Sequence, residues 1–200
     1  MKSCVCSSRF VAGIFSFVLI CLSPTAFANV GRTVGTYAVS PTGAATYTVP
    51  IWAPRGPNGL QPNVSLVYNS QQGTGYVGAG WTLAGISSIY RCDLTYAQDG
   101  SPSTVALATS DGLCLDGQRL RLTSGTQGEA GSTYQTEVAN FENVTAYGSA
   151  GNGPAYFVVQ APNGTQYEYG NGRNSQVLAS GTITAFQWYL DEVTDTSQTP

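Results

Sequence analysis

The chain has 200 residues, eight of them basic, eleven acidic and none histidine, so its net charge is −3. A negative chain argues against nucleic acid and anionic membrane surfaces as partners. Without histidine, neither a Ser-His-Asp or Cys-His nucleophile nor a zinc site of the His/Cys kind can form.

Residues 1–28 have the pattern of a signal peptide. Lys2 and Arg9 accompany an apolar run at 10–22, which is too short to span a bilayer comfortably, and Ala26-Phe27-Ala28 offers an A-x-A cleavage site. Cleavage would leave 200 − 28 = 172 residues, exported to the periplasm or the extracellular space. No later segment could insert stably in a membrane. The mature chain would keep six arginines against eleven acids, a net charge of 6 − 11 = −5.

Alternating apolar and polar residues predict strands at 47–51 and 64–68. Residues 50–62 carry four prolines, at the end of the first run and after it, at positions 50, 54, 57 and 62, and no helix could contain them. We expect a loop there.

Gly73, Gly75 and Gly78 follow in G-x-G-x-x-G spacing. A dinucleotide site needs a helix directly after these glycines, but the next residues include Gly80 and Gly85 and favour extended structure. Asp99 lies at about the distance from these glycines at which a dinucleotide site has its ribose-binding acid, but the residues around it favour a turn and not the end of a strand. The glycines are therefore interpreted as serving tight backbone crossings, and no nucleotide or other cofactor is expected.

Two dipeptides further on predict hairpins. Asp116-Gly117 separates apolar runs at 113–115 and 119–122, and Asn163-Gly164 separates runs at 156–159 and 166–169. Stretches 124–132 and 148–154 are rich in small residues and predict loops. The mature chain is thus predicted to be a single all-β, antiparallel module, sheet-like or sandwich-like.

Export would leave two of the five cysteines, Cys92 and Cys114. An oxidising compartment and a single possible pair predict a disulfide between them, with two buried free thiols as the alternative.

Catalytic and ligand-binding alternatives rest on weaker patterns. A carboxylate pair for glycoside hydrolysis could come from Glu137, Glu142, Asp191, Glu192 and Asp195, although no spacing brings two of them together. Asp111 and Asp116 lack the alternating oxygen ligands of a calcium loop, so no metal site is expected. A sugar-stacking platform could use Trp52, Trp81 and Trp188, although packing is the commoner role of such side chains.

Several segments together resemble one family. They are TGAATYTVPI (42–51), GPNGLQPNVSLVYNS (56–70), GAGWTLAGISSIYRC (78–92), LCLDGQRL (113–120) and WYLDEVTD (188–195). They are similar to the SpvB-type N-terminal domain, found in the B components of Tc insecticidal toxins, in SpvB virulence proteins and in large secreted proteins with RHS/YD repeats. The resemblance covers about residues 33–196.

The resemblance implies a structural β module that helps to build a shell around a toxic segment, with no catalytic residue of its own. The ADP-ribosyltransferase activity of SpvB proteins belongs to a separate domain that this chain does not resemble. We interpret the matching residues as determinants of the fold: Pro50, Pro62, Tyr68, Asn69, Gly80, Trp81, Arg91, Asp116, Gly117, Arg119, Leu120 and Trp188. Asn69 and Arg91 are expected to satisfy backbone groups across loops.

Family members are usually much longer, so residues 29–200 would be one domain, possibly truncated at its C-terminal end, whose partners are downstream RHS/YD-repeat or toxin segments. An exposed strand edge is expected at 183–194. The principal hypothesis is an exported, non-enzymatic module for encapsulation or assembly of a cargo absent from this chain. The alternative is a secreted carbohydrate-binding domain.

Overall fold

A computed structural model describes residues 34–56, 59–75, 77–172 and 174–196. The predicted signal peptide lies outside these residues. Within them the all-β, antiparallel prediction is confirmed, since every strand pairs antiparallel with its neighbours. No helix of the described residues is long and apolar enough to cross a membrane.

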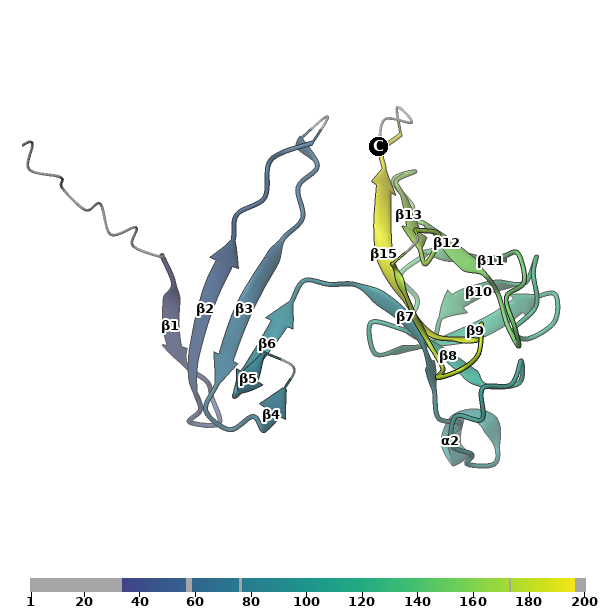
Figure 1. The fold of residues 1–200 in the computed structure, drawn as a ribbon, viewed down its shortest axis with the longest axis horizontal. Coiled ribbons are helices and arrows are strands. Elements are labelled where there is room, and N and C mark those ends of the chain that lie inside the picture. Colours follow the sequence, from purple (N-terminus) through teal and green to yellow (C-terminus); the bar gives the residue numbers. More distant parts are fainter. Residues whose placement is uncertain (1–33, 57–58, 76, 173, 197–200) are drawn as a thin grey trace, which may run out of the picture. The chain divides into compact units, whose positions relative to one another are not determined.

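Four antiparallel strands form an open sheet in the order β1-β2-β3-β6 (Figure 1). Their bounds are Thr36–Val39, Ala45–Ile51, Val64–Asn69 and Trp81–Ala84. A hairpin of two-residue strands, β4 (Thr74–Gly75) and β5 (Gly78–Ala79), lies between β3 and β6 in the sequence. In the described part of the chain β1 pairs only with β2, and β6 only with β3, so each leaves an outer edge.

The remaining strands form a second, barrel-like sheet. Seven consecutive strands, β7 to β13, pair in sequence order, and β15 then pairs with both β7 and β13, so that eight strands close on themselves. The ninth strand, β14, is attached to β15. The bounds are Ser88–Cys92, Gly112–Leu115, Gln118–Ser124, Thr133–Thr136, Asn143–Tyr147, Tyr156–Gln160, Gln166–Tyr169, Gln176–Leu178 and Ala185–Thr194.

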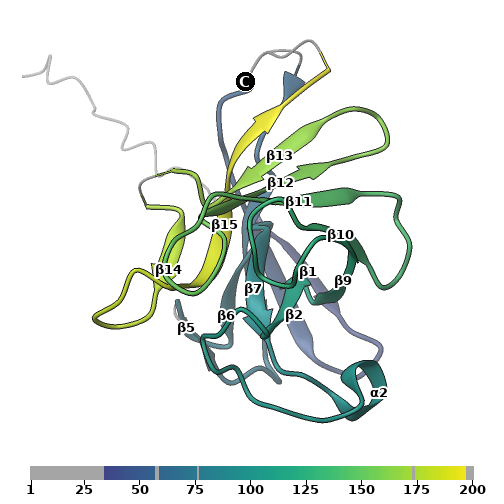
Figure 2. The same cartoon turned by 90° about the vertical axis from the view of Figure 1, so that its right-hand side faces the viewer.

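Strand β15 closes this sheet by pairing in two parts. Residues 187–189 face β7 and residues 190–194 face β13, with an irregular register opposite Glu168 and Tyr169 (Figure 2). The expected exposed edge at 183–194 is wrong for residues 187 and 188, because they pair with β7 and also with β14. Residues 190–194 have β13 as their one partner strand in the described part of the chain, so their other edge has no partner strand. The sequence did not show the pairing with β7 because that strand lies about a hundred residues earlier.

The hydrophobic core lies inside the closed sheet. Trp188, Tyr134, Phe157, Ile89 and Val144 are all fully buried there. Phe157 packs edge-on against Trp188, with ring centroids 5.0 Å apart. The phenol of Tyr134 accepts a hydrogen bond from the Gly128 amide at 2.9 Å, so the largest polar group of the core is satisfied.

Both predicted hairpins are present. Asp116 and Gly117 connect β8 to β9 with φ values of 47° and 87°. In the β12–β13 connection only Gly164 has a positive φ, of 88°, while the Asn163 side chain accepts a hydrogen bond from the Thr165 amide.

The sequence missed the one-turn helix α2 (Tyr96–Asp99), which Thr95 caps at its start and Gly100, with φ 77°, caps at its end. Asp99 thus ends a helical turn.

Candidate functional site

The glycine-rich stretch forms part of the open sheet. Gly75 and Gly78 pair across the β4–β5 hairpin, and the strand β6 follows, in agreement with the predicted extended structure. Gly80 has φ 76°, and a Cβ there would lie 2.6 Å from the Tyr68 ring. Gly85, with φ 86°, would overlap the Asn63 carbonyl oxygen if it carried a side chain. These two glycines permit close crossings of the backbone. Of the three glycines for which this role was predicted, Gly78 has φ 126° and a Cβ on Gly75 would lie 2.8 Å from the Trp81 carbonyl oxygen, whereas a Cβ on Gly73 would meet open space.

Proline and asparagine residues of the open sheet lie at its margins. Pro50 stands in β2, which the sequence placed in the loop, but it pairs with Ser65 of β3 beyond the part of β2 that β1 covers. A proline is tolerated there because its missing N–H is not needed by a neighbouring strand. Pro62 is exposed just before β3. Asn69 accepts a hydrogen bond from the Gln71 amide, so its side chain caps its own turn.

The open sheet has two chemically different faces. Because residues directly opposite each other point to the same side, the register assigns each strand residue to a face. We call one side the apolar face: Tyr37, Val39, Ala45, Tyr47, Val49, Ile51, Val64, Leu66, Tyr68, Trp81 and Leu83. We call the other the threonine face: Thr36, Ala38, Thr46, Thr48, Pro50, Ser65, Val67, Asn69, Thr82 and Ala84. None of these residues is buried.

The three tryptophans occupy different surroundings. Trp188 is fully buried in the core and cannot stack on a sugar, so this member of the proposed platform is excluded. Trp81 contacts the Tyr68 ring, with centroids 5.4 Å apart, and the Tyr47 ring edge-on at 6.4 Å. Trp52 is 82% exposed in the segment after β2. Of the three tryptophans, only Trp52 and Trp81 present aromatic surface to solvent.

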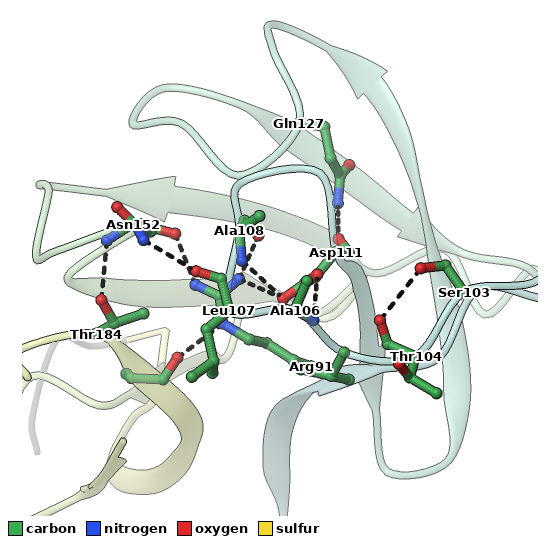
Figure 3. Close-up of polar contacts among 12 residues, drawn as sticks. Arg91, Ser103, Thr104, Ala106, Leu107, Ala108, Asp111, Gln127, Asn152 and Thr184 are labelled. Carbon is green, nitrogen blue, oxygen red and sulfur yellow. Dashed lines mark hydrogen bonds and ion pairs between the residues drawn. The ribbon is translucent and has the colours of Figure 1, made fainter. Parts of the chain in front are cut away.

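A buried arginine joins two loops and the start of β15 at one end of the closed sheet (Figure 3). Arg91 of β7 is 3% exposed, and its guanidinium donates hydrogen bonds to the carbonyl oxygens of Ala185, Ala108 and Asn152 at 2.6–2.8 Å. The Arg91 guanidinium carbon lies 5.7 Å from the centre of the buried Trp188 ring. A single cation thus serves carbonyl groups from segments that are far apart in the sequence.

Asp111 neutralises this arginine. Its carboxylate lies 3.0 Å from Arg91 Nη1 and also accepts hydrogen bonds from the Ala106 and Ala108 amides, both about 3 Å long. Its backbone carbonyl accepts from the Gln127 side chain (Figure 3). The sequence analysis singled out Arg91 but considered Asp111 only as a calcium ligand, which it rejected. A buried charge of this kind persists because every polar atom around it has a partner.

A second ion pair lies beside the two cysteines. Arg119 of β9 contacts the carboxylate of Asp99 at 2.6 Å and the Asp93 carbonyl at 3.2 Å. Cys92 and Cys114 stand on the paired strands β7 and β8 with Cα atoms 5.9 Å apart, within the range that a disulfide requires. The bridge is thus compatible with the fold, and its formation in the cell stays a prediction.

The Asp116-Gly117 turn is tied to the start of β7, the strand that pairs with β8. Asp116 accepts hydrogen bonds from the Ser87 hydroxyl at 2.6 Å and from the Ser88 amide at 2.8 Å. The Ser87 hydroxyl in turn lies 2.8 Å from the Tyr169 phenol. The Ser87 proton is donated to Asp116, so the Tyr169 phenol donates to Ser87. Burial raises the pKa of Tyr169 to about 12. No local sequence pattern indicated this chain of three groups.

Carboxylates do come together, on strands β13 and β15, but not as an enclosed catalytic pair. Glu168, which the sequence analysis missed, is the register partner of Glu192. The pKa of Glu168 is raised mainly by partial burial and further by the nearby negative charges of Asp191 and Glu192. Asp191 is occupied structurally, since it accepts hydrogen bonds from the Gly172 amide and the Ser175 hydroxyl. The described residues contain no group of three or more Asp, Glu or Cys placed to hold a metal.

Of the other three acidic candidates, Asp195 directly follows β15, and Glu137 and Glu142 lie on other segments. Glu137 follows β10, and its side chain accepts a hydrogen bond from Gln98 of α2. Glu142 precedes β11 and is hydrogen-bonded to Asn140. Each of these last two carboxylates is therefore engaged in a local surface contact.

Comparison with known proteins gives one family and several structures. The family model described as Salmonella virulence plasmid 65kDa B protein, SpvB, matches residues 39–198. No curated protein matches the sequence. The crystal structure of TcdB2-TccC3 has a TM-score of 0.59 and 18% identity, over 84% of this chain and 8% of that chain.

Two further structures share the fold. The N-terminal domain of the effector protein SpvB from Salmonella typhimurium strain LT2 has a TM-score of 0.53 and 21% identity, over 70% of this chain and 48% of that one. The TcdB2-TccC3-Cdc42 structure has a TM-score of 0.56 and 18% identity, over 76% of this chain and 8% of that one. The chain spans less than half the length of each of these structures.

Proposed function

Since the chain belongs to the SpvB family, whose model covers residues 39–198, we propose that it is an exported, non-enzymatic structural module of a larger, toxin-related shell protein. Its role is to extend a sheet wall that encloses or assembles a cargo encoded elsewhere. Its partners are RHS/YD-repeat or toxin segments of the same protein or complex.

The observation that carries this proposal is the pair of outer edges on the open sheet. In the described residues the far sides of β1 and β6 have no partner strand. Such edges are templates for further pairing, and monomeric proteins normally blunt them with charges, prolines or a covering element. Neither Thr36–Val39 nor Trp81–Ala84 contains a charge or a proline. Strands from another segment could therefore continue the sheet on either side.

The closed sheet supplies the rigid part of such a module. Its core contains Trp188, Tyr134 and Phe157, and Arg91, paired with Asp111, holds two of its loops and the start of β15 together. We assign the matching residues, among them Arg91, Arg119, Asp116 and Trp188, to the fold and not to chemistry. Asp191 accepts hydrogen bonds from the Gly172 amide and the Ser175 hydroxyl, which favours a structural role over a catalytic one for the carboxylates of β13 and β15.

The proposal is tested on the coding DNA that follows codon 200 and on the segment it encodes. We expect RHS/YD repeats there or in the adjacent gene. The chain and that repeat segment, expressed as separate polypeptides in one cell, should then co-purify. An unrelated all-β segment of similar length is the control. If the following DNA and the adjacent gene encode no RHS/YD repeats, or if the repeats do not bind the chain, the proposal is contradicted.

Export is part of the proposal and has its own test. The A-x-A motif predicts that protein recovered from the periplasm or medium begins at Asn29. N-terminal sequencing measures this directly. Recovery of the protein only from the cytoplasm, with residues 1–28 still present, would oppose it.

A carbohydrate-binding role is the second candidate, and the exposed Trp52 ring is the observation in its favour. Sugar recognition also needs hydrogen-bonding side chains beside the aromatic ring. The apolar face around Trp81 offers only the phenols of Tyr37, Tyr47 and Tyr68 for that purpose. Binding on a glycan array that is lost in both Trp52→Ala and Trp81→Ala would support this candidate against the structural one.

A further inference from the structure

The apolar face of the open sheet lacks a covering layer in the described part of the chain. Its edge residue Tyr37 is 87% exposed, Val39 is 73% exposed, and its central residues Leu66 and Tyr68 are only half-buried. Isolated sheets are stable when a hydrophobic face packs on something else. An uncovered face of this composition marks an interaction site, because soluble proteins rarely leave such patches in water.

Charge favours a second copy of the same chain as the occupant. No residue of β1, β2, β3 or β6 is charged, although the chain as a whole carries a net charge of −3. Two copies could therefore meet through this sheet without bringing like charges into the contact. A charged partner would find no complementary group on either face.

The arrangement of side chains is self-complementary. An aromatic row, Tyr37–Tyr47–Tyr68–Trp81, crosses all four strands, since these residues are register partners. Two residues along, an aliphatic row of Val49, Leu66 and Leu83 crosses three strands. A two-fold axis that lies in the plane of contact, between the rows and parallel to them, places the aromatic row of each copy on the aliphatic row of the other. Large side chains then meet smaller ones, as in packed sheets.

The size of the face is close to what a weak dimer needs. The four strands contain 4, 7, 6 and 4 residues, and each residue covers roughly 3.3 by 4.8 Å, so the face measures roughly 330 Å². Two copies would together bury roughly 670 Å² of flat area, and more with side-chain relief, which is at the low end of the range for weak interfaces, below about 1,200 Å².

We infer that the apolar face of the open sheet binds the same face of a second copy of this chain, forming a two-fold dimer in which two sheets stack. The inference does not rest on the proposed function, which concerns the edges of the sheet and not its face.

The test compares two lysine substitutions on the edge strand β1. Tyr37→Lys places a charge on the apolar face, and Ala38→Lys places the same charge on the threonine face, one residue away. Both positions are exposed, so neither change should affect folding of the single copy. Sedimentation equilibrium over micromolar to sub-millimolar concentrations measures the association, and circular dichroism verifies the folds.

We expect the average mass of the unaltered protein to approach twice that of the single copy as concentration rises. Tyr37→Lys should weaken association roughly tenfold or more, as loss of an interface tyrosine does, while Ala38→Lys should leave it unchanged. A single-copy mass at every concentration overturns the inference. So does equal weakening by both substitutions, which indicates edge-to-edge pairing of β1, or association that resists Tyr37→Lys.

Discussion

Replacing Arg91 by methionine should cost the fold about 3–5 kcal/mol, the range for removal of one partner from a buried ion pair. Methionine fills much of the space of the arginine stem but leaves three carbonyl oxygens, those of Ala185, Ala108 and Asn152, without their donor. It also leaves the Asp111 carboxylate buried without a cation, supported only by two backbone amides. Because a domain of this kind has a total stability of about 5–15 kcal/mol, the loss is a large fraction of the whole.

Urea unfolding, followed through tryptophan fluorescence, measures this cost. The buried Trp188 reports on the core directly, since Arg91 lies over its ring. With a denaturant slope of about 2 kcal/mol/M, the midpoint should fall by roughly 2 M. The matched control is Arg121→Met, because Arg121 is exposed and its described contact is one hydrogen bond, to the Gln98 carbonyl. That change should shift the midpoint little.

The reasoning also predicts coupling between the two charges. Replacing Arg91 and Asp111 together by methionine and leucine should cost clearly less than the sum of the two single changes, because no uncompensated charge remains. A midpoint for Arg91→Met equal to that of Arg121→Met would refute the assignment of Arg91 as the group that holds these loops. Additive single changes would refute the ion pair.

Three further predictions concern oxidation and pH. Unreduced protein from the periplasm should show no alkylation at Cys92 or Cys114 in mass spectrometry, and two alkylated cysteines would count against the bridge. Because the bridge would close a loop of this length, Cys114→Ser should lower the free energy of unfolding by about 3 kcal/mol. The folded-state pKa of Tyr169, about 12, lies above its ordinary value of 10.0, so stability should fall as pH rises between these values, by up to about 2–3 kcal/mol. In Tyr169→Phe, the stability should not show this loss between the two pKa values, and a pH dependence equal to that of the unaltered protein would contradict the assignment of Tyr169 as a buried phenol. The raised pKa of Glu168 means that its stabilising contribution is present in acid and is lost as pH rises through that pKa. Glu192→Gln should therefore stabilise the fold by a few tenths of a kcal/mol at neutral pH and have no effect well below pH 4.5, as thermal unfolding at the two pH values would show.

Local features of the fold could be predicted from the sequence because neighbouring residues determine them. Asp116-Gly117 specifies a tight hairpin through the φ values that these residues tolerate. The alternation of Tyr47, Val49 and Ile51 specifies a strand with one apolar side. The same reasoning rejected a helix after Gly78, and β6 does follow there.

Non-local features could not be predicted. Alternation in β2 shows that one face is apolar but not what covers it. The pairing of Trp188 with Ile89 joins residues about a hundred positions apart, and no short-range pattern records it. Asp111 looks like an ordinary turn residue until the fold places Arg91 beside it. Sequence reasoning therefore found the separate strands and hairpins but missed the closure of the sheet and its buried ion pair.

The way β15 closes the larger sheet has a consequence for the order of events in folding. Strand β7 gains its second neighbour only when residues 187–189 arrive, and β13 only when residues 190–194 arrive. Contacts between such distant segments form slowly, because a long loop must close before they yield any stabilisation. The core around Trp188 therefore cannot be completed on a growing chain until almost all of the residues up to Thr194 have been made. The closed sheet of a chain with this delay stays incomplete for most of its synthesis, which is compatible with the export proposed above.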